Sequence, residues 1–479
     1  MGDDTTKLIP EVSVIGSVQY GSTEKEEDRI TNVTADVDVV VPRTGGLGTI
    51  GAIFNVISSV LGGGILSFPY AFAAAGILNG IFSTLILSVF AYAALIIIIL
   101  TYETFAKEKA DSYQSVVRAV FGRGMELFMI LSIALYSFGS CIAFLVIIGD
   151  QFVPIIQEFL GYDAWYASRW FIISTTTLVI VLPLCLMKEI NRLKYSSFLA
   201  TAMVYYFALM VIYFALMGTV DDTGAQTEPL IDNTVPIASE WNWKFSLQYF
   251  QSIPIICFAF QCHLSIIPIY KAMKDASPKR AAGISCIALI NCTALYVLVG
   301  LFGYLTFFCL TQSDVLLNYD ESNVAVIICR AGMGLVSCFA YPILNFVARL
   351  AINDFILWFA PVFSISIENE KIEQCNIRFY AITLIVTISA AAMAIFVPTI
   401  NAVVSLLGSI FAVCFIFVFP GLFLIKLRNA KSYIKYSKIL LVVGLFYIFF
   451  GIAMGAISLT LSVYNDIQFL LSGNVLPPC

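Results

Sequence analysis

The chain has 479 residues, of which 60% are hydrophobic and 12% are charged, and its formal net charge is −5. A soluble domain carries about twice this share of charged residues. The composition therefore excludes a soluble domain and a basic surface that binds nucleic acid. It predicts an all-α polytopic membrane protein whose partner is the lipid bilayer.

The amino-terminal stretch, residues 1–45, is polar and contains a charged run at 24–29. Such a composition cannot bury enough apolar surface to fold alone. It also lacks the basic start and the apolar core of a cleavable signal peptide. We predict a disordered cytosolic tail at 1–45, a transmembrane domain at 46–465, and a short outer or lumenal tail at 466–479.

Eleven apolar stretches follow the tail, each close to the roughly 20 residues that a helix needs to cross a bilayer. They lie near residues 47–75, 77–102, 125–149, 169–187, 196–219, 245–271, 281–309, 324–349, 378–399, 401–425 and 439–463. The short apolar segment Phe355–Phe359 is not long enough to cross, and we expect it to pack along the cytosolic membrane surface.

The positive charges support this count of spans. If the amino terminus is cytosolic, all but three of the 26 lysines and arginines fall on the cytosolic side. The exceptions are Arg169, Lys244 and Arg330. Cytosolic loops of membrane proteins carry an excess of Lys and Arg, and one missed span in the middle would have moved all later loops to the other side.

Two of the spans are interrupted at matching depths, about two hundred residues apart. The first, 50–75, contains Gly62, Gly63 and Gly64, and the second, 245–270, is broken near Phe258–Phe260. Unwound backbone is tolerated in lipid only where it lines a cavity or is buried in protein. Paired interruptions of this kind are typical of secondary transporters built from inverted repeats, so we divide the eleven spans into five, five and one.

The chemistry of the two breaks suits a small zwitterion such as an amino acid. Free backbone N–H groups in the first break can bind a carboxylate without a basic side chain. Carbonyls in the second break can take an ammonium group, with the phenylalanine rings as walls. The alternative for the glycines is tight helix packing. The predicted substrate-binding residues are Ser59, Gly62, Gly63, Gly64, Phe258, Ala259 and Phe260.

His263 is the only histidine of the chain and directly follows the second break. Ionisable groups inside a membrane are costly and mark functional sites, and a histidine can carry a proton near neutral pH. The alternative is a neutral imidazole that holds the broken segment by a hydrogen bond, which we favour. A second histidine and the common catalytic motifs are missing from the sequence, so we expect no enzyme, metal site or cofactor.

Three strings of residues resemble those of a known family. Ile53–Asn55 followed by Gly62–Pro69 resembles the first helix of the amino acid/auxin permease family. Phe258–His263 followed by Ile267–Tyr270 is similar to the family's sixth helix, and Phe302–Phe307 to the end of its seventh. Within the family, the likeness points to the sodium-coupled neutral amino acid transporters and the vacuolar amino acid transporters.

The resemblance covers about 47–463. It implies a LeuT-like 5+5 inverted repeat with broken helices 1 and 6 plus an eleventh helix, carrying amino acids by alternating access. Residues that would hold a coupling ion, or support the structure, are Ser58, Leu61, His263 and Ala340. The sodium-coupled members carry an asparagine where we align Ser58 and a hydroxyl residue where we align Ala340. Because alanine offers no side-chain oxygen, we expect proton coupling or facilitated transport instead of strong sodium coupling.

The predicted function is therefore transport of an amino acid, with a proton as a candidate second partner. The absence of an acidic residue in the middle of a span favours a neutral substrate. A sensor that binds an amino acid in the same pocket without net transport is the alternative. The string Asp4–Ile9 resembles an acidic dileucine sorting signal, which leaves the endolysosome or vacuole and the plasma membrane open. A disulfide between Cys309 and Cys329 also remains open.

Overall fold

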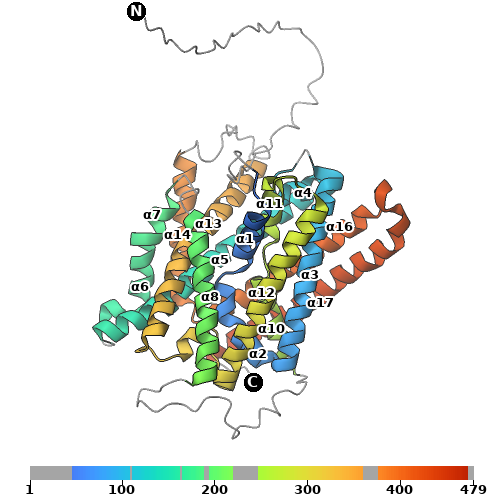
Figure 1. Ribbon diagram of the computed structural model, residues 1–479. Helices are drawn as coiled ribbons and strands as arrows, with labels where there is room; N and C mark the ends of the chain where they lie inside the picture. The colour runs from blue at the N-terminus through green and yellow to red at the C-terminus, as the bar shows by residue number, and fades with distance from the viewer. Residues whose placement is uncertain are drawn as a thin grey trace, which may run out of the picture. The chain divides into compact units, whose positions relative to one another are not determined.

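The computed structural model describes residues 46–107, 110–161, 164–187, 194–218, 246–359 and 376–472. Within these ranges the chain is helical apart from connecting segments and one isolated bridge between Leu47 and Met273 (Figure 1). The predicted all-α class is confirmed. The predicted cytosolic tail at 1–45 and residues 473–479 lie outside the described residues.

The helices follow one another along the chain and many are continuous with short 3-10 or π turns. Their bounds are α1 Thr49–Val60, α2 Phe68–Ala75, α3 Ile77–Thr101, α4 Tyr113–Phe121, α5 Arg123–Leu160, α6 Arg169–Thr176, α7 Leu182–Cys185, α8 Lys194–Met217, α10 Tyr249–Ala259, α11 Ile266–Ala272, α12 Pro278–Phe307, α13 Val324–Phe359, α14 Asn376–Phe396, α15 Ile400–Leu407, α16 Phe419–Leu427 and α17 Ser437–Ser472.

Among the described residues, nine helices are long and apolar enough to cross a membrane, and the bent pair Thr49–Val60 and Gly63–Ala75 makes a tenth. The predicted fourth span corresponds to the apolar helix Arg169–Cys185. At 1.5 Å per residue this helix is about 26 Å long, slightly less than the roughly 30 Å of a bilayer's hydrocarbon core. A multi-pass membrane protein is thus confirmed.

One predicted segment needs correction. Phe355–Phe359 does not form a separate surface segment, because α13 continues without a break from Val324 to Phe359. The helix keeps its backbone hydrogen bonds by running past the predicted end of the span. Helix α17 continues to Ser472 and so includes the first residues of the predicted outer or lumenal tail at 466–479, whose side of the membrane stays a prediction.

Local sequence explains where several helices begin. Gly76 separates α2 from α3 with a φ of 81°, and Gly122 separates α4 from α5 with a φ of 83°. Glycine is the residue that adopts such positive φ values without strain. Ser277 caps α12 by accepting a hydrogen bond from Arg280 N–H, and Pro278 follows at the first helical position, where its missing N–H costs nothing.

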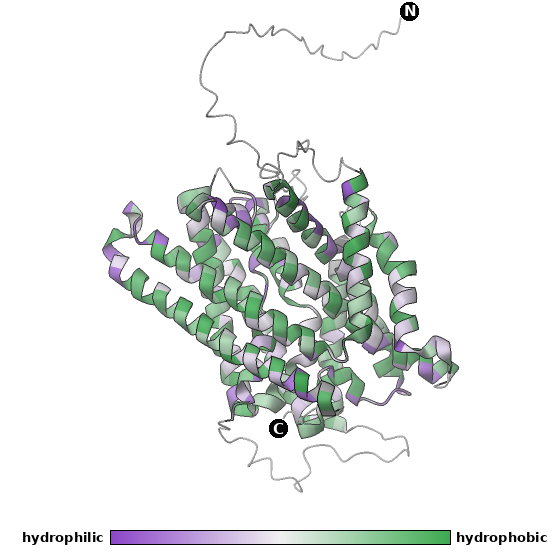
Figure 2. Cartoon of the chain, turned by 180° about the vertical axis from the view of Figure 1, so that it is seen from behind, coloured by the Kyte–Doolittle hydropathy of each residue, from purple (hydrophilic) through white to green (hydrophobic). Residues whose placement is uncertain are grey.

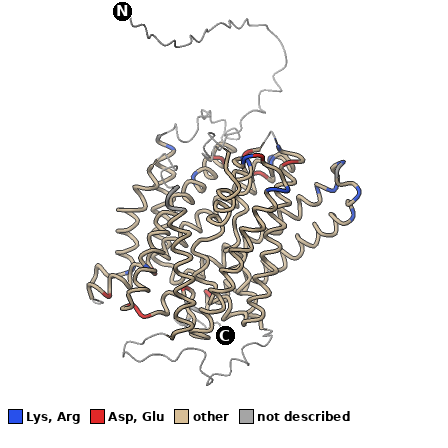
Figure 3. Tube along the Cα trace, viewed as in Figure 1, with Lys and Arg blue, Asp and Glu red and all other residues tan. Residues whose placement is uncertain are grey.

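The distribution of polarity fits a bundle embedded in lipid. Hydrophobic residues line the helices along their length, and hydrophilic ones gather toward the ends (Figure 2). On α17, Val442, Phe449 and Ile452 are more than half exposed, which is costly in water but not against acyl chains. Most lysines and arginines of the described residues lie at one end of the bundle (Figure 3).

The helices that carry the two breaks lie in the interior. The long helices α5 and α13 pack along each other. Helix α12 packs against α1, α2, α3 and α8, and α10 packs against α2, α15 and α17. The first half of the chain is thereby held against the second, and the two broken segments face each other across the core.

Candidate functional site

The first break lies where the glycine triplet predicts it. Helix α1 ends at Val60, Leu61 and Gly62 are extended, and a 3-10 turn, η1, runs from Gly63 to Ser67 before α2. The two halves of the span are bent by 51°. Gly62 has φ −148° and ψ −163°, which is ordinary extended backbone that any residue can adopt.

Donor groups of the backbone are free at this break. The first hydrogen bond of the η1 turn runs from Ile65 N–H to Gly62 O, at 3.3 Å. The N–H groups of Gly62, Gly63 and Gly64 precede it and have no backbone acceptor within the described part of the chain. They are orphan donors of the kind that a helix start leaves for an external partner.

The three glycines have different surroundings. A Cβ placed on Gly62 would meet no atom within 4 Å, so this residue borders open space. A Cβ on Gly63 would lie 2.3 Å from the tip of the Ile147 side chain. A Cβ on Gly64 would lie 3.2 Å from the Cβ of Ala259 and 3.3 Å from its Cα. Gly64 therefore lets the first break approach the backbone of the second.

The second break begins slightly later than predicted. Helix α10 includes Phe258 and Ala259, and the chain leaves the helix at Phe260. A short 3-10 turn, η6 (His263–Ser265), leads into α11. Pro254 lies inside α10, but the helix passes through it, so proline does not set the position of the break.

The carbonyls expected to be free at the second break have hydrogen-bond donors in this structure. Gln261 N–H donates to Phe258 O at 3.1 Å, and Cys262 N–H donates to Phe260 O at 3.0 Å. Ala259 O accepts from the hydroxyl of Tyr296 at 3.1 Å. Their predicted role toward a substrate ammonium stays a prediction, and each oxygen still has a second lone pair.

Tyr296 of α12 connects the two breaks, and sequence reasoning missed it. Its hydroxyl also donates to Val60 O, the last carbonyl of α1, at 2.8 Å. One proton is thus shared between a carbonyl of each broken span. The ring is fully buried, stacks on Phe68 at 4.3 Å between centroids and meets Phe260 edge-on at 5.3 Å.

Of the two phenylalanine rings predicted as walls of the substrate pocket, one contacts Tyr296. Phe260 is fully buried and packs on Tyr296, whereas Phe258 is partly buried beside Tyr136 of α5. The side chain of Gln261, which follows directly, has its amide oxygen and nitrogen buried without a hydrogen-bond partner in the described residues. A buried amide without a partner is costly, which makes Gln261 a further candidate for contact with a ligand.

His263 is fully buried directly after the second break. Its Nε2 lies 3.2 Å from the carbonyl oxygen of Ala91 in α3, and Nδ1 has no partner in the described ranges. In the tautomer with a proton on Nε2, the imidazole donates to Ala91 O. This bond joins the broken span to α3, and the structural role that we favoured for His263 stays a prediction.

The remaining candidates occupy α1, its end and α13. The Ser59 hydroxyl donates to Asn55 O at 2.7 Å, within the same helix. Ser58 is partly buried, and Leu61 is buried at the break. Ala340 lies on α13 and is partly exposed. Their predicted relation to an ion stays a prediction.

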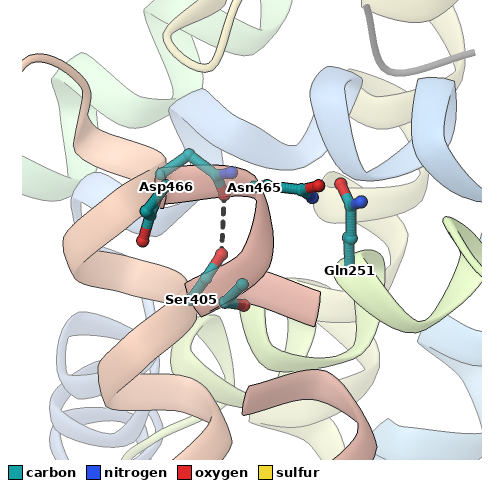
Figure 4. Close-up of a pocket in the computed structure, with 6 residues that line it drawn as sticks. Gln251, Ser405, Asn465 and Asp466 are labelled. Carbon is teal, nitrogen blue, oxygen red and sulfur yellow. Dashed lines mark hydrogen bonds between the residues drawn. The ribbon is translucent and has the colours of Figure 1, made fainter. Parts of the chain in front are cut away.

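A separate polar cavity lies between α10, α15 and α17, with room for one water-sized guest. Figure 4 shows Gln251, Ser405, Asn465 and Asp466 around it. Ser405 donates to Asn401 Oδ1 at 2.9 Å, and the buried hydroxyl of Ser462 has no partner among the described residues. A bound water satisfies such groups.

The question of a Cys309–Cys329 disulfide is answered by the structure. Cys329 is a free, fully buried thiol. Cys309 is disulfide-bonded, so its partner is not Cys329. Burial of Cys329 inside α13 removes it from reach.

Residues 45–463 match the family described as transmembrane amino acid transporter protein. The chain belongs to this family. It is an integral membrane transporter family, not a family of enzymes, and the predicted resemblance to amino acid permeases is confirmed.

Individual relatives agree with this assignment. The chain is 33% identical to sodium-coupled neutral amino acid transporter 7 of Danio rerio over 432 residues, which are 88% of this transporter and 89% of the relative. It is 35% identical to the Homo sapiens protein of the same name over 393 residues, 80% of each. The structural alignment with a solved structure of a Na+-coupled sialic acid symporter covers 86% of this chain and 95% of the symporter chain, with 13% sequence identity and a TM-score of 0.48.

Proposed function

We propose that this transporter carries neutral amino acids by alternating access, with the substrate held between the two broken spans. Family membership gives amino acid transport, and the names of the relatives favour neutral substrates. The single observation that carries the location is the close approach of Gly64 to Ala259, with Tyr296 bonded to the last carbonyls of α1 and α10. A guest at this point touches both halves of the chain.

The broken spans are the first and the sixth of the predicted eleven, if Arg169–Cys185 is counted as the fourth. This order supports the 5+5 arrangement, in which equivalent helices of two inverted repeats meet at the substrate. The amino terminus is then cytosolic, since the end of the bundle rich in Lys and Arg is the cytosolic one.

The polar groups suit an α-amino acid. The orphan N–H groups of Gly62 and Gly63 offer donors to a carboxylate, and Gly62 borders open space. The carbonyl of Ala259 accepts an ammonium group if Tyr296 gives its proton fully to Val60 O. Gln261 supplies an amide with no partner inside the described protein. None of these residues is charged, which disfavours cationic and anionic side chains on the substrate.

Coupling to a proton, or facilitated transport, fits the residues better than strong sodium coupling. Sodium needs oxygen ligands, and Ala340 supplies none from its side chain. The oxygens of Ser58 and of the Leu61 backbone are the other candidate ligands that we predict at this position.

Reconstitution tests the proposal directly. The purified protein in lipid vesicles is given a panel of radiolabelled amino acids, in sodium and in choline, at two pH values. We expect uptake of neutral amino acids that vesicles without protein do not show. Saturable binding with no flux for any amino acid would contradict transport and leave the sensor as the better account.

A further inference from the structure

A buried polar network lies at the end of the bundle where α6 begins. It joins Asp150 and Gln151 of α5 to Arg169 at the start of α6, Arg330 of α13, and Asp314 of the connection between α12 and α13. Asp314, Gln151 and Arg330 are fully buried, and Asp150 is 5% exposed. Buried charges of this kind are retained only when they are paired or serve a function.

The network fixes a short turn of the connection between α12 and α13. This turn, the 3-10 helix η8, runs from Val315 to Asn318. Asp314 begins it by accepting a hydrogen bond from Leu316 N–H at 3.0 Å, and Gln151 donates to the same carboxylate. Arg330 binds the other side of the η8 turn, where it donates to Leu316 O at 2.8 Å and to Tyr319 O at 3.3 Å.

The held turn touches the first break. Residues of η8 contact residues of η1, the turn that follows Gly62, and also contact α5. Val315 and Leu316 are fully buried in this packing. A change that loosens η8 therefore also loosens its packing against the first broken span.

The network is not fully satisfied. The amide oxygen of Gln151 and the Nε and Nη1 of Arg330 have no hydrogen-bond partner among the residues described. Arg169 pairs with Asp150. The carboxylate of Asp314 thus shares a desolvated site with a second acid, Asp150, and Arg330 is the buried cation that acts on it.

These surroundings bring the pKa of Asp314 into the range of physiological pH. Burial, and then the charge of Asp150, raise its pKa to about 7. The bonds from Leu316 N–H and Gln151 and the charge of Arg330 lower the pKa by less. The other groups at this place are Glu321, which acts on Arg330, and Tyr319 and Cys329, which are buried and neutral.

We propose that Asp314 is a proton-binding site of the transport cycle, which holds a proton while η8 is packed on the first break and releases it when η8 lifts into water. This rests on the proposed transport function. In water an aspartate has a pKa of about 3.9, so the packed state binds the proton more tightly. By linkage, acid pH stabilises the packed turn, and this stabilisation is lost as pH rises through about 7.

Substrate exchange in proteoliposomes at equal pH on both sides tests the cycle. The share of ionised Asp314 rises about tenfold from pH 6 to pH 8 for a pKa near 7, so we expect exchange to accelerate by up to that factor. Asp314→Asn stays neutral and should be slow and independent of pH. Asp320→Asn, in the same connection and bonded within the described ranges only to nearby Ser322, should keep the wild-type profile.

Hydrogen–deuterium exchange tests the turn itself without relying on transport. The amides of Leu316–Tyr319 are compared between wild type and Asp314→Asn at the same pH, which cancels the intrinsic effect of pH. The lifted turn of the wild type is ionised above about pH 3.9, whereas asparagine stays neutral. We therefore expect faster exchange in the wild type at both values, with a ratio to Asp314→Asn that is about tenfold larger at pH 8 than at pH 6. Equal exchange at both values would overturn the proposal, whereas absent transport with the expected amide difference would overturn only the proposed function.

A second variant guards against misfolding of Asp314→Asn. Gln151→Met removes a hydrogen bond that lowers the pKa of Asp314. The midpoint of the pH profile, both for exchange and for amide protection, should then move to higher pH. An unchanged midpoint in a folded Gln151→Met protein would also count against Asp314 as the proton site.

Discussion

Alanine at Gly62 and at Gly64 separates binding from packing at the first break. Gly62 is extended and borders open space, so an added methyl meets nothing within 4 Å. Gly64 is different, because its added methyl would sit 3.2 Å from the Cβ of Ala259. The two substitutions add the same methyl group at positions two residues apart, so each variant serves as the control for the other.

The expected energies follow from these distances. At Gly64, the second break must shift by a few tenths of an ångström, and such overpacking costs about 1–3 kcal/mol. We expect the melting temperature of Gly64→Ala to fall by a few degrees, on the order of what such a loss gives in a large domain. Gly62→Ala should keep its stability or gain slightly, because alanine restricts the unfolded chain.

We expect the effect on transport to be larger for Gly62→Ala, although the effect on stability is larger for Gly64→Ala. If a carboxylate docks on the N–H groups of Gly62 and Gly63, the methyl of Gly62→Ala occupies its path, and a displacement of about 1 Å costs tenfold or more in rate. Thermal unfolding in detergent and uptake in vesicles measure the two effects. Wild-type uptake by a stable Gly62→Ala protein would refute the substrate site at this break.

Other substitutions and conditions test neighbouring parts of the account. Gly63→Val should lose transport while the protein still reaches its membrane. If the clash with the Ile147 side chain lowers the stability of this variant, adding Ile147→Ala should restore it. Normal uptake by Gly63→Val alone would mean that the glycines only pack helices. Replacing sodium by choline should change uptake less than about twofold, because Ala340 provides no oxygen ligand; a collapse of uptake would show that backbone carbonyls hold the ion or that our alignment is wrong. His263→Gln should keep the pH profile and lose only about 1 kcal/mol of stability, and an abolished response to a proton gradient would instead make His263 the coupling group. Tyr296→Phe should slow transport and lower the melting temperature, since one hydroxyl serves both breaks; unchanged values in both assays would exclude that role.

The features that are local to the chain were predictable from sequence. Consecutive glycines in an apolar span mark the first break wherever the rest of the protein lies, and the apolar lengths mark the other spans. The second break was placed one or two residues early, because Phe258 and Ala259 keep helical hydrogen bonds that no local pattern reveals. The continuation of α13 to Phe359 was missed for the same reason.

The features that depend on distant contacts were not predictable. Tyr296 is 236 residues away from its partner Val60, and in sequence it is one more aromatic residue of an apolar span. Gln151 and Asp314 are 163 residues apart, and each lies outside the predicted spans, in a connection where a polar residue is common. Only packing brings these groups together and removes them from water.

Counterflow in proteoliposomes tests most directly the claim that an amino acid passes through this protein. Vesicles are loaded with an unlabelled neutral amino acid, and the uptake of the same labelled amino acid is followed from outside without any ion gradient. The account predicts that the internal substrate accelerates labelled uptake and that Gly62→Ala loses this acceleration. Labelled binding that the internal substrate does not change would contradict alternating access.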